Sequence, residues 1–206
     1  MILEIVSVGT MQVNCYILAS SPGSSAIIID PGDQADKIQR VLDKDQLKPA
    51  FIINTHGHYD HIGCDNKFGV PVYIHQEDLA LLKDPELNLS SLFSLDYQVK
   101  SKVKTVKEED IIVLDDISLK VLHIPGHTPG GIALLMQKPE NKIVFTGDTL
   151  FFQGIGRSDL AGGSEELLIR SIKEKLMVLP EDTVVHPGHG PSSTIGREKR
   201  SNSFLS

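Results

Sequence analysis

The 206-residue sequence lacks several features that mark particular classes of protein. Its two cysteines, Cys15 and Cys64, are too few for a disulfide framework and form no CxxC motif. No apolar run approaches the roughly 20 residues of a membrane-spanning helix, and the first residues lack the basic region and cleavage site of a secretory signal. These absences argue against a secreted disulfide scaffold and a membrane partner. They predict a cytoplasmic protein.

Positive charge is also scarce. The chain has 20 Lys and Arg against 27 Asp and Glu, which gives a formal net charge of −7. Because an acidic surface repels a phosphate backbone, nucleic acid is not expected to be the main partner. The Gly-rich stretch Gln153–Gly163 does not fit GxGxxG, and no GxxxxGK(S/T) phosphate loop is present, so nucleotide binding has no support either.

Strand-like and helix-like patterns alternate along the chain, separated by turn-forming residues. The predicted strands are Ile2–Val8, Val13–Ala19, Ala26–Ile29, Phe51–Asn54, Pro71–His75, Ile117–His123, Gly131–Met136, Lys142–Thr146 and Thr183–His186. The predicted helices are Gln34–Lys44, Gln76–Leu82 and Ser164–Leu179, the last opening with an N-cap serine. The pattern and the length predict one α/β domain over residues 1–206, with a mobile loop at Asp84–Ser101.

Four potential metal ligands lie within six residues directly after an apolar strand: His56, His58, Asp60 and His61. This HxHxDH cluster offers imidazoles and a carboxylate, the ligands that a borderline metal such as zinc takes. His56 and His58 lie on one side of an extended segment, and Gly57 between them removes a side chain that would crowd the site. Asp60 and His61 can then face a second ion.

Three further candidates occur singly, each beside a glycine at the end of a predicted strand: His127, Asp148 and His189. Together they indicate a site assembled from several loops along one edge of a sheet. A lone histidine is more often a surface or hydrogen-bonded residue, and that interpretation is kept for His75, His123 and His186. For HxHxDH the competing interpretations are a solvated turn and a non-catalytic metal module. A structural zinc site closes with four ligands, whereas seven candidates leave coordination positions open.

These motifs resemble the metallo-β-lactamase superfamily, and within it the short bacterial single-domain glyoxalase II-like hydrolases. The resemblance covers nearly the whole chain and rests on the HxHxDH cluster and on Gln12–Tyr16, Asp30–Gly32, Gly154–Asp159 and Pro187–Arg197. It implies a four-layer αβ/βα sandwich with the metal site at one edge of the two sheets. Asp148 in place of a cysteine points away from zinc β-lactamases with a cysteine ligand. His58 in place of a glutamate points away from the flavodiiron proteins.

The resemblance also implies how the ligands are shared between two divalent ions, zinc being favoured and iron or manganese being alternatives. One ion would take His56, His58 and His127, the other would take Asp60, His61 and His189, and Asp148 would bridge them. Two ions carry a charge of +4 and the two carboxylates supply −2, which favours a bridging hydroxide at neutral pH as the nucleophile. Asp60 is placed to orient the attacking water.

The expected activity is hydrolysis of an acyl thioester of the hydroxyacylglutathione type, with S-lactoylglutathione as the substrate that the resemblance suggests. A thiol has a pKa of about 8.5 and leaves without a strong general acid, whereas an amide nitrogen must first be protonated. Full-length glyoxalase II grips glutathione with a C-terminal helical domain. Only residues 190–206 follow His189 here, so no such domain is expected and another thioester stays open.

Other superfamily activities stay open as well. Persulfide dioxygenases share the motif but bind one iron through the residues matching His56, His127 and Asp148, a ligand set suited to oxygen chemistry. Lactone or ester hydrolysis is a further alternative, and nuclease activity is disfavoured by the acidic charge.

Arg157 is a candidate for holding a substrate carboxylate or, alternatively, for pairing with Asp159.

Three more residues have two interpretations each. Asp30 could orient a ligand imidazole or be a plain turn residue. Cys64 is interpreted as a buried structural cysteine rather than a thiol ligand or nucleophile. Tyr59 is interpreted as a packing residue.

Overall fold

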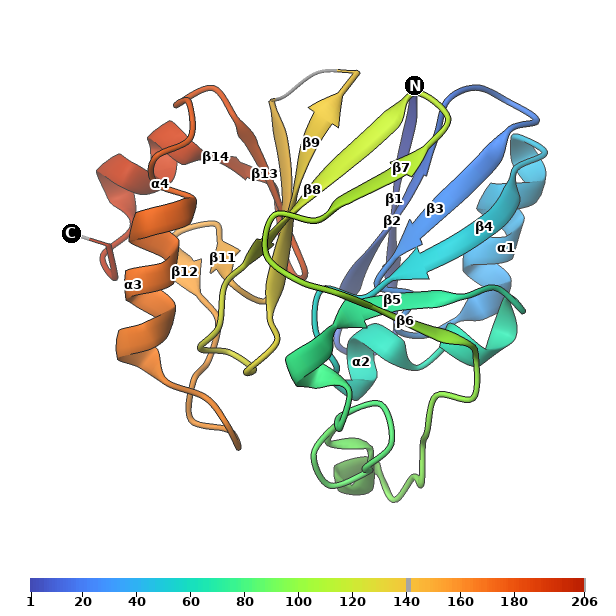
Figure 1. Cartoon of the computed structure of the whole chain (residues 1–206), viewed down its shortest axis with the longest axis horizontal. Helices are drawn as coiled ribbons and strands as arrows, with labels where there is room; N and C mark the ends of the chain where they lie inside the picture. Colours follow the sequence, from blue (N-terminus) through green and yellow to red (C-terminus); the bar gives the residue numbers. More distant parts are fainter. Residues whose placement is uncertain (140–141, 206) are drawn as a thin grey trace.

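Two six-stranded sheets face each other in the computed structural model, which describes residues 1–139 and 142–205 (Figure 1). The first sheet runs in chain order through β1 (Ile2–Val8), β2 (Val13–Ala19), β3 (Ser25–Ile29), β4 (Lys48–Ile53), β5 (Val72–His75) and β6 (Val103–Val106). The second sheet has the order β14 (Ser193–Thr194), β13 (Val184–Pro187), β10 (Ile143–Gly147), β9 (Ile132–Lys138), β8 (Ile117–His123) and β7 (Ile111–Leu114). β11 (Leu150–Phe151) and β12 (Gly154–Ile155) form a separate small hairpin.

Helices cover the outer faces of both sheets (Figure 1). α1 (Ala35–Lys44) lies against the first sheet, and α3 (Glu165–Lys175) and α4 (Ile195–Ser201) lie against the second. The short α2 (Tyr59–Ile62) lies where the two sheets approach each other. The predicted four-layer αβ/βα sandwich of the α/β class is therefore confirmed.

Three hydrophobic cores separate the four layers, and β2 shows how the sequence divides between them. Cys15 and Ile17 point toward α1, whereas Tyr16 and Leu18 point into the core between the sheets, because successive side chains of a strand face opposite ways. Both faces of β2 are buried, which explains why Cys15–Ala19 is apolar throughout rather than alternating. The third core lies under α3, around Leu168 and Ile172.

The predicted helix at Gln76–Leu82 is wrong. The segment forms one 3-10 turn at Gln76–Asp78, and the amides of Leu79 and Leu81 bond to carbonyls only three residues back. The side chain of Asp78 is buried and accepts hydrogen bonds from two distant loops. This tertiary anchoring overrides the local helical pattern, which the amino-acid spacing alone could not reveal.

Other predicted elements differ mainly in their ends. Ser164 caps α3 as predicted, accepting a hydrogen bond from the Leu167 amide at 3.3 Å, but the helix ends at Lys175 rather than Leu179. Within Asp84–Ser101 the structure has turns and a 3-10 segment at Ser90–Phe93. Strands β6 and β7 and helix α4 were not predicted. Within the described part of the chain, no helix combines the length and apolar character needed to cross a membrane.

The topology brings several strand ends to one edge of the sandwich. The predicted ligands lie in the loops that directly follow the carboxyl ends of β4, β8, β10 and β13. β10 and β13 are parallel neighbours, and β8 runs in the same direction because β9 between β8 and β10 is antiparallel to both. Loops far apart in the sequence therefore meet at this edge.

Phe145 in β10 tests the packing between the sheets. Its ring is fully buried and lies edge-on to Tyr16 of the opposite sheet, with 5.0 Å between centroids. We expect Phe145→Ala to lower the free energy of unfolding by roughly 3–5 kcal/mol, measured by urea denaturation, because it leaves a cavity in this core. Val178→Ala, at a side chain that is 71% exposed, is the control and should change it little. A loss under about 1 kcal/mol for Phe145→Ala would contradict the described packing.

Candidate metal centre

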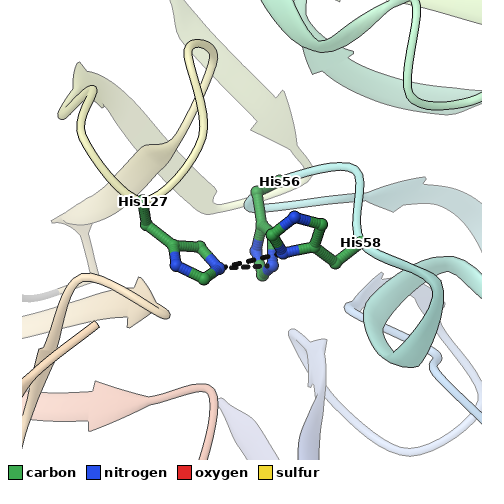
Figure 2. Close-up of side chains that lie close together, drawn as sticks. All are labelled: His56, His58 and His127. Atoms are coloured by element: carbon green, nitrogen blue, oxygen red, sulfur yellow. Dashed lines mark hydrogen bonds between the residues drawn. The ribbon is translucent and has the colours of Figure 1, made fainter. Parts of the chain in front are cut away.

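Three buried imidazoles from two loops converge on one point (Figure 2). Nδ1 of His58 lies 3.0 Å from Nε2 of His127, and that atom lies 3.2 Å from Nε2 of His56. His56 and His58 follow β4, whereas His127 follows β8, so each sheet supplies part of the group. This is the set predicted for one metal ion.

A second group lies beside the first. Nε2 of His189 is 3.4 Å from Oδ2 of Asp60, and Nε2 of His61 is 3.9 Å from the same oxygen. Asp148 lies between the two groups: its Oδ1 is 3.3 Å from Nε2 of His61, and its Oδ2 is 3.8 Å from Nε2 of His127. The structure thus brings together all seven residues that the sequence singled out as ligands.

Oxygen atoms on the outer side of three rings, two of them hydrogen-bonded, indicate which nitrogen faces inward. Nδ1 of His127 donates to the Arg157 carbonyl at 2.7 Å, and Nδ1 of His189 donates to the Met11 carbonyl at 2.9 Å. Nδ1 of His61 lies 3.0 Å from Oδ2 of Asp30. Since these oxygens can only accept, Nδ1 carries the proton in each neutral ring and Nε2 turns its lone pair toward the centre.

When all the rings are neutral, electron pairs therefore face one another at the centre and no donor lies between them. Nε2 of His61 and Oδ1 of Asp148 are buried, make no hydrogen bond, and face each other. Such a cluster of lone pairs and carboxylate oxygens is repulsive unless protons or cations lie between them. The residues present fit divalent cations, and the imidazole and carboxylate donors suit zinc, iron or manganese.

The local electrostatics divide the histidines into two classes. Burial lowers the pKa of His56 well below its ordinary value and that of His58 to about 3, so both rings are neutral and ready to bind a metal. His61 and His189 behave oppositely. Burial opposes the charged form of each, yet Asp148 and neighbouring carboxylates raise the pKa of His61 well above normal and that of His189 to about 9. In the metal-free protein, His61 and His189 therefore carry protons at the positions where a cation would bind.

Asp30 orients a predicted ligand rather than serving as a plain turn residue. Its Oδ1 accepts from the Thr55 amide at 2.7 Å, and its Oδ2 accepts from the Thr55 hydroxyl at 2.7 Å and lies beside His61. The carboxylate is buried at the end of β3. It therefore ties the start of the HxHxDH loop to the ring orientation of His61.

Asp78 is a second brace, and it was missed from the sequence. One carboxylate oxygen accepts from the Gly57 amide at 3.0 Å and from the Thr128 hydroxyl at 2.8 Å, and the other accepts from the Gly130 amide at 2.6 Å. It joins the loop of His56 and His58 to the loop of His127. Its only sequence signal is an acidic residue shortly after a predicted strand, which is too weak to identify it.

The segment Gln12–Tyr16, which the family resemblance included, holds the His189 loop. The Asn14 side chain donates to the carbonyls of Pro187 and Gly190 at 3.1 and 2.9 Å, and the Tyr16 hydroxyl donates to that of Pro187 at 2.6 Å. Gly188 in this loop has no room for a side chain, since a Cβ there would lie 2.3 Å from Oδ1 of Asp148. The glycine beside His189 therefore permits the close approach of the predicted ligands.

Arg157 lies at the rim of the cavity over the metal centre. Its guanidinium forms a two-pronged ion pair with Asp159, with both N···O distances at 2.8 Å. This internal pair is the predicted alternative to binding a substrate carboxylate. The backbone carbonyl of the same residue orients His127, so Arg157 contributes to the site in any case.

The other three histidines and Cys64 lie apart from the seven predicted ligands. His75 and His123 stack with 3.9 Å between ring centroids, and Nε2 of His123 bonds to the Pro129 carbonyl at 2.9 Å. Nδ1 of His186 bonds to the Ser192 hydroxyl at 2.8 Å. Cys64 is buried, and burial raises the pKa of its thiol to about 11, which makes it a poor nucleophile.

Known proteins resemble this chain over most of its length. The sequence pattern described as the metallo-beta-lactamase superfamily matches residues 8–189. An uncharacterized protein of Mycobacterium tuberculosis is 45% identical over 96% of this chain and 94% of its own length. The hydroxyacylglutathione hydrolase GloC of Haemophilus influenzae is 37% identical over 98% of this chain and 97% of its own.

Several solved structures share the fold of this chain. BLEG-1, titled a B3 metallo-beta-lactamase, has a TM-score of 0.92 and 38% identity, with full coverage of both chains. TTHA1623 in a di-iron-bound form has a TM-score of 0.85 and 36% identity, covering 98% of this chain and 100% of its own. ETHE1 from Myxococcus xanthus has a TM-score of 0.78 and 26% identity, covering 98% and 84%.

The Asp78 brace generates a prediction about metal affinity. We expect Asp78→Ala to weaken binding of the cation held by His56, His58 and His127 by about 10- to 100-fold, since the two loops lose their shared acceptor. Competition with a chromophoric chelator measures the affinity, and circular dichroism checks the fold. Asp110→Ala, which removes a carboxylate that accepts from the Lys107 amide, is the control. Unchanged affinity in a folded Asp78→Ala protein would refute this role.

Proton release should distinguish the two groups of ligands. At pH 7 the raised pKa values keep His61 and His189 protonated in the metal-free protein, whereas His56 and His58 are already neutral. A cation held by His61 and His189 must displace their protons, so its affinity should fall as the pH is lowered below about 9. Zinc titration of weakly buffered, metal-free protein with a pH indicator should show at least two protons released per chain, one from each of these rings, besides any proton lost by metal-bound water.

The variant His189→Ala should release about one proton fewer in the same titration. Zinc binding by the unaltered protein without any proton release would show that the carboxylates do not hold these rings in the charged form.

Proposed function

The chain belongs to the metallo-β-lactamase superfamily, and on that premise we propose that it is a metal-dependent hydrolase of acyl thioesters. The observation that carries the proposal is the inward-facing set of seven metal-binding side chains at the edge of the sandwich. A relative named hydroxyacylglutathione hydrolase, aligned over nearly the whole chain, supports the choice of thioesters. Two free, buried cysteines suit a reducing compartment, and we propose the cytoplasm.

The residues divide the work of the reaction. His56, His58 and His127 would hold one cation, Asp60, His61 and His189 the other, and Asp148 would contact both. Cations so held would polarise the substrate carbonyl and lower the pKa of water to about 7. Asp60 is one-fifth exposed, at 22%, and lies on the wall of the cavity, where its carboxylate can accept a proton from the attacking water and orient it.

The overall reaction adds the elements of water across the C–S bond. The water oxygen bonds to the acyl carbon, the C–S bond breaks with its electron pair on sulfur, and the thiolate takes a proton to become the thiol. Among the described residues that line the cavity, the only phenol is Tyr59, and burial raises its pKa, which makes it a weak acid. A site without a strong acid suits a thiolate leaving group better than an amine.

Zinc is the metal we propose, on the strength of the imidazole-rich ligand set. A neighbour solved in a di-iron-bound form makes iron the main competitor. A mononuclear iron dioxygenase acting on persulfides is the second candidate function, since His56, His127 and Asp148 alone form a set of two histidines and one carboxylate. Lactones and activated esters are the alternative substrates for a hydrolase, because their leaving groups also need little protonation.

Metal content and two assays separate these functions. The purified protein should contain two zinc ions per chain and should hydrolyse S-lactoylglutathione, with loss of activity on chelation and recovery with zinc. Oxygen consumption with glutathione persulfide should be absent. One iron per chain with oxygen uptake, or hydrolysis at full rate after exhaustive chelation, would overturn the proposal.

The role of Asp60 gives a residue-level test. Asp60→Ala should lower kcat/KM for thioester hydrolysis by at least about 100-fold, because both a metal ligand and the water-orienting carboxylate are lost. The fold should survive, as judged by circular dichroism. Asp182→Ala, which removes an exposed carboxylate paired with Lys142, is the matched control and should retain full activity. Near-normal turnover by Asp60→Ala would show that the reaction takes place elsewhere.

A further inference from the structure

A second cavity, of about 140 Å³, adjoins the metal centre. Its apolar lining comes from Val8, Met11, Val13, Tyr59, Phe93 and Leu95, and we call it the apolar groove. Met11, Tyr59, Asp60 and Phe93 line both the groove and the cavity over the metals. The two spaces are therefore neighbours with a shared wall, and a substrate bound at the metals can extend into the groove.

The groove is built from three segments that meet beside the metals. Met11 lies in the turn between β1 and β2, Tyr59 opens α2, and Phe93 ends the 3-10 segment Ser90–Phe93. The rings of Tyr59 and Phe93 lie 6.0 Å apart between centroids. Met11, Phe93 and Leu95 are 53%, 51% and 43% exposed, so large apolar side chains gather on the surface beside the site. Clustered exposed apolar side chains of this kind mark binding surfaces.

The charge of the groove restricts what it can bind. Among the described residues that line it, the charged side chains are the carboxylates of Asp33 and Asp60. The nearby cation Arg157, on the wall of the metal cavity, is paired with Asp159. No basic side chain is present among the described lining residues to pair with a carboxylate such as those of glutathione. An uncharged apolar group is the complementary occupant.

Size and leaving-group chemistry define that group further. A dry apolar cavity of about 150 Å³ in another protein accommodates benzene, so a group of about six carbons matches the groove. When the C–S bond breaks, negative charge develops on sulfur, and that charge is disfavoured beside two carboxylates and an apolar wall. The sulfur arm should therefore lie away from the groove and the acyl arm within it.

We propose that the apolar groove binds the acyl arm of the substrate, an uncharged aliphatic or aromatic group of about six carbons. This inference rests on the proposed thioester hydrolysis and narrows its substrate class. It also assigns Phe93 and Leu95 as specificity-determining residues, because they lie in the groove and outside the set of metal ligands.

A matched series of thioesters tests the inference. The thiol is kept as N-acetylcysteamine, and the acyl group is varied through acetyl, butyryl and hexanoyl, with S-lactoylglutathione alongside. Burial of each methylene should raise kcat/KM by up to about fourfold, so hexanoyl, with four more methylenes, should exceed acetyl by up to about 250-fold. Phe93→Ala and Leu95→Ala should each flatten this dependence. Val113→Ala, at an exposed position in β7, should leave it unchanged.

A binding measurement removes the dependence on turnover. S-hexyl-N-acetylcysteamine is a thioether that cannot be hydrolysed, and its binding should shift the amide NMR signals of residues 8–11 and 93–95. The Phe93→Ala protein should bind it more weakly. Analytical ultracentrifugation covers the other potential occupant, a second copy of this chain: a dimer that Phe93→Ala dissociates would overturn the inference.

The outcomes also separate the two proposals. If none of the thioesters is hydrolysed by the zinc-loaded protein, the proposed function fails. If all are hydrolysed at rates independent of acyl length, or if the dependence is unaffected by Phe93→Ala, the function stands and the apolar groove has been misassigned. A steep dependence on acyl length that Phe93→Ala removes would support both.

Discussion

The structure depends on one electrostatic constraint, which is the burial of many electron-pair donors around a single point. Imidazole nitrogens and carboxylate oxygens from four loops face each other at 3.0–3.9 Å, and carbonyl or carboxylate groups behind three of the rings hold those rings in that direction. The arrangement is stable only when positive charge lies at its centre. Two buried carboxylates outside the ligand set, Asp30 and Asp78, brace the loops against this repulsion.

The sandwich serves this constraint by its topology. Strands that run in the same direction place their carboxyl ends at one edge, so residues separated by more than a hundred positions become neighbours. Two apolar sheets packed face to face supply a rigid base for the loops, and the outer helices seal the remaining faces. The chemistry is thus carried by short irregular segments, each of which starts from a buried strand.

Sequence reasoning succeeded where the signal is local. A few consecutive residues are enough to recognise the HxHxDH cluster and the buried strands. The same holds for the glycines beside His127, Asp148 and His189. It failed where distant parts of the chain decide. The pattern at Gln76–Leu82 is helical, yet Asp78 is bonded to Gly57, Thr128 and Gly130, and a single sequence contains no trace of those partners. The short strands β6 and β7 were missed for a related reason, because their partly exposed side chains give little periodicity.

The turn between β1 and β2 has a double role with an evolutionary consequence. The carbonyl of Met11 holds the ring of His189, while the side chain of the same residue lines the apolar groove. Any backbone shift that reshapes the groove for a different substrate also tilts a ring that faces the metal centre. Selectivity and metal retention are therefore linked traits in this turn, and a lineage that alters one there must compensate for the other elsewhere.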